Sequence, residues 1–335
     1  MDLFIPDQAF PACSCKWCNI GLATCTQRCP TGHSISIGPS PHLFLVLIND
    51  IHENVESCTR LFADDCLLYN TIESPGDEAV LQRDLDKMVS WADKWGMRFN
   101  PAKCNTLRLT RDRNPGHTNY EMMGTVLEET KETKYLGIFL QNDLRWNRQT
   151  QFATGKATRV LNFVRRNFYH VSPVVKERLY HTLVRPHLDY ATAAWDPHTS
   201  KNIKSIERVQ KRAARFVTNT YGKDTSIRNI LASLDWSPLQ ERRKQHRLSC
   251  LHKMINGQLD INYLDYIQPK SDRARRSYRR GHNCQFKQTH SRTDAFANSY
   301  FMRTVPEWNQ LTHETVIHTD PAKFITALKT PKSTH

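Results

Sequence analysis

Two adjacent carboxylates interrupt an apolar run in the stretch RLFADDCLLY, residues 60–69, and they limit how this part of the chain can fold. An ionised carboxylate is costly to bury without a partner, and two neighbouring carboxylates repel each other. In one continuous strand Asp64 and Asp65 would point to opposite faces. At the tip of a tight hairpin both can approach one point. The sequence therefore predicts two antiparallel strands that meet at Ala63 to Asp65, with both carboxylates accessible to solvent.

A hard divalent cation offsets the repulsion between two such carboxylates, because Mg²⁺ prefers oxygen ligands. Two ions held by carboxylates are a common device for phosphoryl and nucleotidyl transfer. Asp64 and Asp65 are therefore candidate Mg²⁺ ligands. The alternative is a solvated turn, which the apolar residues on both sides of the pair disfavour.

The charge of the chain is distributed unevenly between its two halves. Residues 1–150 contain 15 Lys and Arg against 19 Asp and Glu, whereas residues 151–335 contain 32 against 14. The resulting net charges of −4 and +18 are typical of a neutral or acidic half joined to a half that binds a polyanion. A basic surface that serves only solubility is the alternative.

Two segments of the second half concentrate these basic residues. The stretch KNIKSIERVQKRAARFV places apolar side chains on one helical face, and its basic residues mostly cover the other face. The candidate nucleic-acid-binding residues of this helix are Lys204, Arg208, Lys211, Arg212 and Arg215. The stretch KSDRARRSYRR adds Arg273, Arg275, Arg276, Arg279 and Arg280. Basic residues with interspersed aromatic side chains suit phosphate contacts and base stacking.

Hydrophobic periodicity and turn residues predict the elements of the first half. Five prolines within residues 1–42 predict mostly loop. From Glu78 to Trp95 apolar residues recur every three or four positions, which predicts an amphipathic helix with Asp77 as its N-cap and Gly96 as its stop.

Further strands are predicted downstream of that helix. Residues 97–110 predict a strand, a turn at Asn100 and Pro101, and a second strand. The run KYLGIFL at residues 134–140 predicts one more strand, and beyond Thr150 the pattern becomes helical.

The N-terminal segment is rich in cysteine. Its cysteines are Cys13, Cys15, Cys18, Cys25 and Cys29. They supply enough soft ligands for zinc, but their spacing differs from the paired C-x2-C pattern of established zinc sites. A poorly structured, divergent leader is the alternative.

The sequence offers no membrane-spanning or secretory segment. Apolar runs of 18 or more residues are absent, and the N-terminus lacks a basic segment followed by a long apolar one. We therefore expect an intracellular protein, in the nucleus or the cytoplasm.

The motifs together resemble one known family. FADD with its apolar flanks resembles motif C of the reverse transcriptases of non-LTR, LINE-type, jockey-like retrotransposons. The stretch LQRDLDKMVSWADKWGMRFNPAKC is similar to the helix and motif D of that family, and KYLGIFLQNDLRW is similar to its primer-grip strand. RPHLDYATAAWDP and IERVQKRAARFV resemble its thumb and post-thumb segments. The resemblance covers roughly residues 30–310 and indicates the C-terminal part of an RNA-directed DNA polymerase.

The resemblance implies an α+β fold, in which a partial right-hand polymerase palm precedes a helical thumb and a basic C-terminal region. The palm would combine an antiparallel sheet with helices. The implied divisions are a divergent Cys-rich leader at 1–29, the palm at 30–145, the thumb and post-thumb at 146–235 and the basic region at 236–335.

The resemblance also implies a chemistry and partners. Asp64 and Asp65 would hold Mg²⁺, and both would be catalytic together with Lys103, which matches the lysine of motif D. The expected partners are an RNA template and a DNA primer. For Lys103 the alternative is an exposed turn lysine without a catalytic role.

Two motifs of the family are altered or missing. Where motif B has Pro-Gln-Gly, this chain has Pro30, Thr31 and Gly32, and the first 29 residues contain no match to motif A, D-x-x-x-A-F-D. Because a two-metal site without the motif A carboxylate cannot hold both ions in register, we expect the chain to be inactive alone. We also expect an incomplete sheet with an unpaired edge near residues 60–69 and 98–109. The alternatives are a non-enzymatic nucleic-acid-binding remnant and a degenerate fragment with no retained function.

Overall fold

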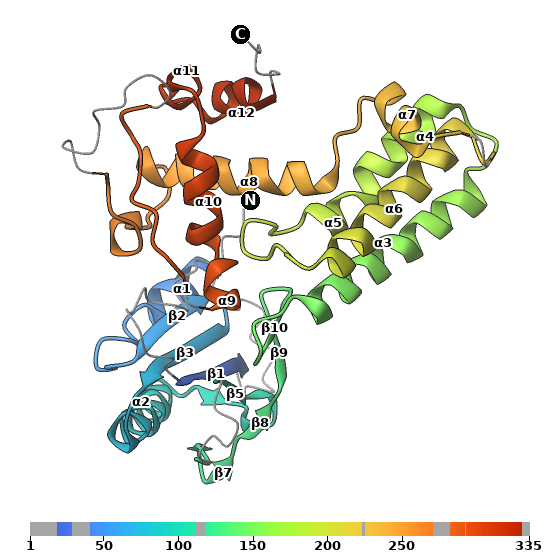
Figure 1. Ribbon diagram of the computed structural model, residues 1–335. Helices are drawn as coiled ribbons and strands as arrows, with labels where there is room; N and C mark the ends of the chain where they lie inside the picture. The colour runs from blue at the N-terminus through green and yellow to red at the C-terminus, as the bar shows by residue number, and fades with distance from the viewer. Residues whose placement is uncertain are drawn as a thin grey trace. The chain divides into compact units, whose positions relative to one another are not determined.

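The chain forms two compact units. The computed structural model describes residues 19–28, 41–110, 118–222, 225–270, 282–291 and 293–329 of the 335-residue chain. One unit is Ser14–Arg145 and the other includes Trp146–His335. We call them the sheet unit and the helical unit (Figure 1). Their mixture of helices and small sheets confirms the predicted α+β class.

Six strands of the sheet unit form one sheet in the order β2-β3-β1-β5-β8, with β4 also paired to β1. Their bounds are β1 Asn19–Arg28, β2 Cys58–Phe62, β3 Asp65–Ile72, β4 Arg98–Phe99, β5 Asn105–Leu109 and β8 Glu128–Thr130. Two separate hairpins are β6 (Glu121–Met122) with β7 (Thr125–Val126), and β9 (Glu132–Tyr135) with β10 (Ile138–Gln141). The helical segments are α1 (Pro41–Ile48), α2 (Pro75–Lys94) and the 3₁₀ turn η2 (Pro101–Lys103).

The central strand of the sheet is β1. Its backbone pairs antiparallel with β3 on one side and with β5 and β4 on the other. The prediction of mostly loop across residues 1–42 is therefore wrong at residues 19–28, which form a strand of the sheet. The predicted unpaired edge is wrong for β3 and β5, each of which has a strand on both sides. Within the described residues, however, β2, which contains residues 60–62, is an edge strand, and β4 pairs with β1 alone.

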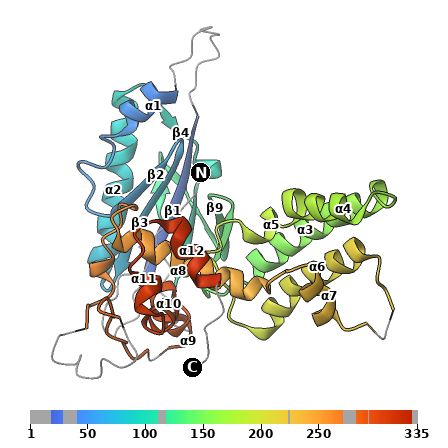
Figure 2. The same ribbon diagram turned by 90° about the horizontal axis from the view of Figure 1, so that it is seen from above.

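One face of the sheet is covered by α2 (Figure 2). Leu81, Leu85 and Met88 of α2 are buried in one cluster with Cys66 and Leu68, which lie two residues apart on β3. Residues two apart on a strand share one face of the sheet, and residues three or four apart on a helix share one face of the helix. The apolar faces of β3 and α2 therefore pack against each other. The amphipathic pattern of the sequence thus identified the face of α2 that enters the core.

The ends of α2 differ in part from the prediction. Its N-cap is Ser74, three residues before the predicted one, and the carboxylate of Asp77 accepts the backbone N–H of Ser74 at 2.8 Å. A carboxylate at the third helical position thus closes a capping box and does not serve as the N-cap. At the other end the prediction is confirmed, because Gly96 follows the C-cap with a φ of 65°.

Residues 134–140 form a hairpin and not the predicted single strand. The chain reverses at Leu136 and Gly137, whose φ angles are 46° and 84°, so that Tyr135 pairs with Ile138. Two consecutive residues with positive φ are typical of the tight turn that best matches the twist of a hairpin. Around Asn100 and Pro101, by contrast, the predicted strand, turn and strand are confirmed as β4, η2 and β5.

The helical unit begins with α3, as the change of pattern near Thr150 predicted. The first part contains α3 (Asn147–Asn167), α4 (Pro173–Leu179), the π-helical turn η3 (Tyr180–Val184), α5 (Pro186–Asp189), α6 (Ser200–Thr218) and α7 (Ile227–Ser233). The second part contains α8 (Leu239–Ile255), η4 (Tyr263–Asp265), α9 (Asp294–Ala297), α10 (Tyr300–Asn309), α11 (His313–Val316) and α12 (Pro321–Lys329). In the described part of the chain, every helix is too short or too polar to cross a bilayer.

A buried carboxylate, Asp196, connects the two parts of the helical unit. Arg247 of α8 forms an ion pair with it, and Arg303 of α10 reaches it with Nη2 at 3.0 Å. Arg247 also binds Glu307 of α10 through two hydrogen bonds of 2.9 and 2.7 Å. Next to this network Trp308, Phe324 and other apolar side chains of α8, α10 and α12 form a buried cluster.

In the sheet unit, Asp84 of α2 is fully buried and accepts several hydrogen bonds. It receives the backbone N–H and hydroxyl of Ser57 at 2.8 and 2.7 Å, and Lys87 Nζ lies 2.9 Å away. Burial alone would raise the pKa of Asp84, but these hydrogen bonds outweigh burial and lower it.

We therefore expect Asp84→Ala to reduce the free energy of unfolding by about 3 kcal/mol, because buried donors lose their acceptor. In the wild type this contribution should be present above the unfolded-state pKa of about 3.9 and be lost as the pH falls through the lower folded-state pKa. Denaturant titrations at several pH values measure both effects. The exposed Asp86 on the same helix provides the control, and an equal loss in Asp86→Ala would contradict the assignment.

Two buried histidines pack against Trp308 in the helical unit. The backbone oxygens of His318 and Trp308 accept hydrogen bonds from Nε2 of His252 and His282, respectively. Within the described residues, the buried Nδ1 atoms of both histidines lack a partner. Burial lowers the pKa of both side chains, since a charged ring there would be poorly solvated.

The helical unit should consequently lose stability in mild acid. The unfolded chain takes up protons at these histidines as the pH falls below about 6.5, and the folded chain resists doing so. The unfolding free energy of the wild type should fall between neutral pH and pH of about 5. In the double variant His252→Gln with His282→Gln the unfolding free energy should fall less over this pH range. In His290→Gln, at an exposed position, it should fall as much as in the wild type.

Candidate metal and nucleic-acid sites

The carboxylate pair lies on the hairpin that the sequence predicts. β2 and β3 are antiparallel, Phe62 pairs with Asp65, and the turn between them is Ala63 and Asp64. Ala63 has a φ of 50°, the left-handed conformation that permits so short a connection. Asp64 is exposed and Asp65 is half-buried, so both carboxylates reach solvent. The predicted hairpin geometry is confirmed.

The two carboxylates are coupled electrostatically. Partial burial raises the pKa of Asp65, and the neighbouring negative charge of Asp64 raises it further. Within the described residues, no Lys or Arg forms an ion pair with either carboxylate. The pair is therefore a concentration of negative charge that no described Lys or Arg neutralises through an ion pair.

In the part of the chain that the structure describes, the surroundings of Asp65 do not complete a two-metal centre. Its partners across the sheet are Phe62 on β2 and Thr26 on β1, and the segment 19–28 contains no Asp or Glu. Among the described residues, no three His, Cys, Asp or Glu side chains are grouped to share an ion. Two-metal catalysis needs carboxylates on more than one element to hold both ions. The acidic side chains of β1, β2 and β3 and of the turn between β2 and β3 do not supply such a set by themselves.

Lys103, the third predicted catalytic residue, lies at the end of η2 and is exposed. The topology brings it toward the same end of β1 as the hairpin. Thr26 of β1 pairs with Asp65, the next residue Gln27 pairs with Phe99, and η2 begins two residues after Phe99. A cationic side chain at that end could contact a phosphate, but the described residues show no hydrogen bond from its ammonium group.

The predicted basic helix is α6. Lys204, Arg208, Lys211 and Arg215 are exposed, and they recur at spacings of four, three and four residues along one face. Arg212 is half-buried and donates to Asn162 Oδ1 of α3 at 3.2 Å, so its guanidinium contributes to helix packing. Four of the five predicted residues of this helix thus form one accessible surface.

Other predicted residues lie outside the part of the chain that the structure describes. They are Arg273, Arg275, Arg276, Arg279 and Arg280, together with Cys13, Cys15, Cys18 and Cys29 of the candidate zinc segment. Sequence analysis also missed the basic residues of α3, which are spread over the length of the helix without a dense run. Their recurrence at positions 148, 159 and 166, close to whole turns of a helix, was the available signal.

Comparison with known proteins finds a family to which part of the chain is similar. Residues 3–140 match the family model described as "Reverse transcriptase (RNA-dependent DNA polymerase)". The match begins well before residue 30, where the resemblance was placed, and so it includes the residues of β1. The segment assigned to a divergent leader therefore aligns with this family too.

Three relatives come from Drosophila mobile elements. Over 180 residues the chain is 26% identical to "Probable RNA-directed DNA polymerase from transposon BS" of Drosophila melanogaster, covering 51% of this chain and 20% of the relative. It is 30% identical over 145 residues to "RNA-directed DNA polymerase from mobile element jockey" of Drosophila funebris, covering 42% and 15%. The X-element polymerase of Drosophila melanogaster is 24% identical over 232 residues, covering 64% and 25%. The chain thus spans a quarter or less of each relative.

The coupling within the carboxylate pair can be tested directly. We expect Asp64→Asn to lower the pKa of Asp65, because it removes the like charge, and to leave the pKa above the ordinary value of about 3.9 because burial persists. Carboxyl chemical shifts followed by NMR during a pH titration measure this change. Asp64→Glu, which keeps the charge, serves as the control. An unchanged pKa in Asp64→Asn would mean that burial alone accounts for the shift.

Proposed function

We propose that this chain, which carries a reverse transcriptase domain homologous to retrotransposon RNA-directed DNA polymerases, binds nucleic acid but does not by itself extend a primer. One observation carries the proposal. The carboxylate pair of the hairpin is flanked by Phe62 and Thr26, so that two adjacent carboxylates are the whole acidic donor set on these three strands. Reverse transcriptases depend on divalent metal ions, and this donor set suits one ion at most.

In this proposal the sheet unit corresponds to a polymerase palm and the first helices of the helical unit correspond to a thumb. Asp64 and Asp65 would bind a single Mg²⁺, and Lys103 would contact a phosphate at the same end of β1. The partners would be an RNA template and a DNA primer, in the nucleus or the cytoplasm. Binding would depend mainly on the basic residues of α6 and of the segment 270–280, whose phosphate contacts need no metal.

Primer extension by the purified chain is the decisive assay. With an RNA template, a DNA primer, deoxynucleotides and Mg²⁺, we expect no product above the level of Asp64→Asn. An active reverse transcriptase under the same conditions shows that the assay works. Extension by the wild type that is lost in Asp64→Asn would overturn the proposed inactivity.

Binding should persist in the absence of catalysis. We expect micromolar, weakly sequence-selective binding that weakens steeply with salt, since each neutralised phosphate releases counterions. Replacing Arg273, Arg275, Arg276, Arg279 and Arg280 together with Ala should lower both the affinity and the salt dependence. Asp64→Asn should bind as well as the wild type or slightly better, because it removes a negative charge. Loss of binding in Asp64→Asn would instead indicate that the hairpin carboxylates hold the nucleic acid.

A further inference from the structure

Three cysteines occupy neighbouring positions on adjacent strands of the sheet. Cys25 of β1 pairs directly with Cys66 of β3. On the other side of β1, Thr24 pairs with Asn105 at the start of β5. The strands are antiparallel, so the next position along β1, Cys25, lies opposite Cys104. The backbone of Cys104 is extended, with φ −90° and ψ 136°, and therefore continues the line of β5.

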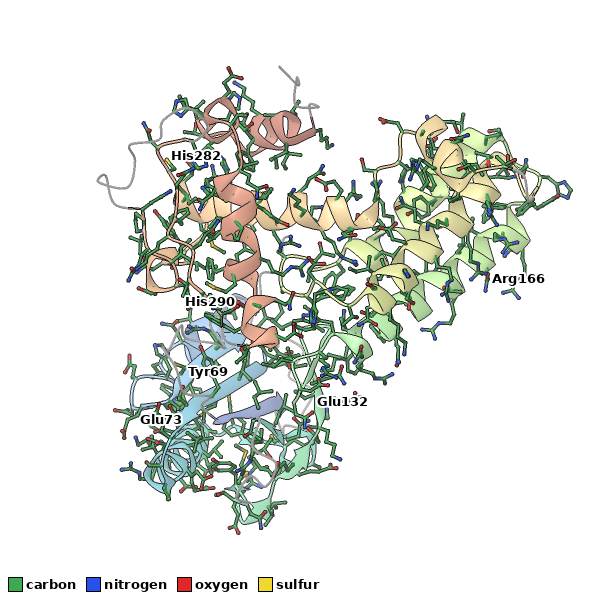
Figure 3. All side chains as sticks on the ribbon, viewed as in Figure 1. Tyr69, Glu73, Glu132, Arg166, His282 and His290 are labelled. Atoms are coloured by element: carbon green, nitrogen blue, oxygen red, sulfur yellow. The ribbon has the colours of Figure 1, made fainter. Side chains whose placement is uncertain are left out.

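The two outer cysteines belong to the core between the sheet and α2. Cys66 and Cys104 are each 3% exposed, and they lie in one buried cluster with Leu68. Cys66 and Leu68 share the face of β3 that contacts α2. Tyr69, labelled in Figure 3, lies three residues after Cys66 and so belongs to the opposite face. The side chains of Cys66 and Cys104 are therefore shielded from solvent.

The oxidation state of the cysteines narrows their pairing. Cys104 is disulfide-bonded. The free cysteines in the part of the chain that the structure describes are Cys58, Cys66, Cys250 and Cys284. Because the chain has ten cysteines, the partner of Cys104 is one of the five in the N-terminal segment. Of these five, Cys25 lies opposite Cys104 in the register of β1 and β5.

The spacing of the strands allows Cys25 two partners, one at a time. Directly opposite residues on antiparallel strands have Cα atoms about 4.5–5.5 Å apart. A disulfide spans Cα separations of about 4.4–6.8 Å, so both neighbours of Cys25 are within reach. Cys66 and Cys104 are two strand spacings apart, about 9.5 Å, and cannot bond to each other.

We propose that Cys25 and Cys104 form a reversible disulfide that holds β1 in the sheet, and that its co-reactant is a low-molecular-weight thiol–disulfide couple such as glutathione. In the oxidised chain a covalent bond ties β1 to the start of β5. In the reduced chain β1 is held by its backbone pairing and side-chain packing. Thr26, the residue after Cys25, pairs with Asp65, so the bond lies one residue from the position that faces the carboxylate hairpin. This inference does not depend on the proposed function.

Formation of the bond removes two electrons and two protons from two thiols. One protein thiolate attacks glutathione disulfide, which releases a glutathione thiolate and leaves a mixed disulfide. The second protein thiolate attacks the protein sulfur of the mixed disulfide and releases the second glutathione. Because Cys104 is buried, these steps take place while β1 is parted from β5, and the closed sheet then shields the bond from reduction.

Cys66 is the competing partner of Cys25, and its environment explains why it remains a thiol. Burial raises the pKa of Cys66 to about 12. At neutral pH almost none of this side chain is the thiolate that disulfide exchange requires. Cys66 therefore provides a matched control, since it lies on the other strand beside Cys25.

Peptide mapping of the full chain tests the pairing. The chain is equilibrated with glutathione disulfide, alkylated in denaturant without reductant, and digested with trypsin. The three cysteines fall in separate tryptic peptides, residues 17–28, 61–83 and 104–108. We expect peptide 17–28 to be linked to peptide 104–108, and Cys66 to be alkylated. Cys18 shares the first peptide, so Cys18→Ser should keep the link and Cys25→Ser should abolish it. A free Cys104, or a bond from Cys104 to any other cysteine, would overturn the inference.

Amide hydrogen exchange tests whether the bond holds the strand. In the wild type reduced with a phosphine, we expect the amides of residues 19–28 to exchange at least about tenfold faster than in the oxidised wild type. The amides of α3, in the other unit, should be unaffected. Cys104→Ser should resemble the reduced wild type, and Cys66→Ser should resemble the oxidised wild type. Equal exchange of β1 in the two redox states of the wild type, or an equal loss of protection in α3, would refute a bond that acts on this strand.

Discussion

A carboxylate removed from water must be surrounded by donors, and this constraint organises both units of the chain. In the sheet unit Asp84 holds the segment at Ser57 against α2, across 27 residues of sequence. In the helical unit Asp196 accepts hydrogen bonds from Arg247 and Arg303, which lie 51 and 107 residues further along the chain. Each of these carboxylates joins elements that are distant in sequence. Asp64 and Asp65 differ from them, because they are left accessible at a turn, and they remain available to a cation from solution.

Local patterns in the sequence predicted the elements whose cause is local. The hairpin at Ala63 followed from the cost of burying two adjacent charges, and α2 followed from its apolar period. The strand β1 could not be predicted in this way, because its partners β3 and β5 begin about 40 and 80 residues after it ends. Its conformation depends on these non-local backbone hydrogen bonds, which outweigh the loop tendency of its proline-rich surroundings. The turn at Leu136 was missed because only Gly137 marks it.

The same distinction applies to the candidate sites. Two carboxylates adjacent in sequence are visible as a pair, and their exposure follows from the hairpin. Whether a third ligand faces them depends on which strand lies beside β3, and no local pattern indicates that Thr26 occupies this position. The basic residues of α3 were likewise missed, because they are spread along the helix without a dense run. A dense basic run can be recognised in a sequence, whereas a surface shared by two helices depends on how the helices pack.

The distribution of charge separates the two candidate sites by their physical requirements. The acidic first half repels phosphates at the hairpin unless a cation lies between them, since Asp64 and Asp65 add to its net negative charge. The basic second half would attract phosphates without any cofactor, and binding them would release counterions. Affinity for a polyanion can therefore be independent of a bound metal ion. Because the two sites depend on different groups, loss of catalysis and retention of binding are physically compatible in one chain.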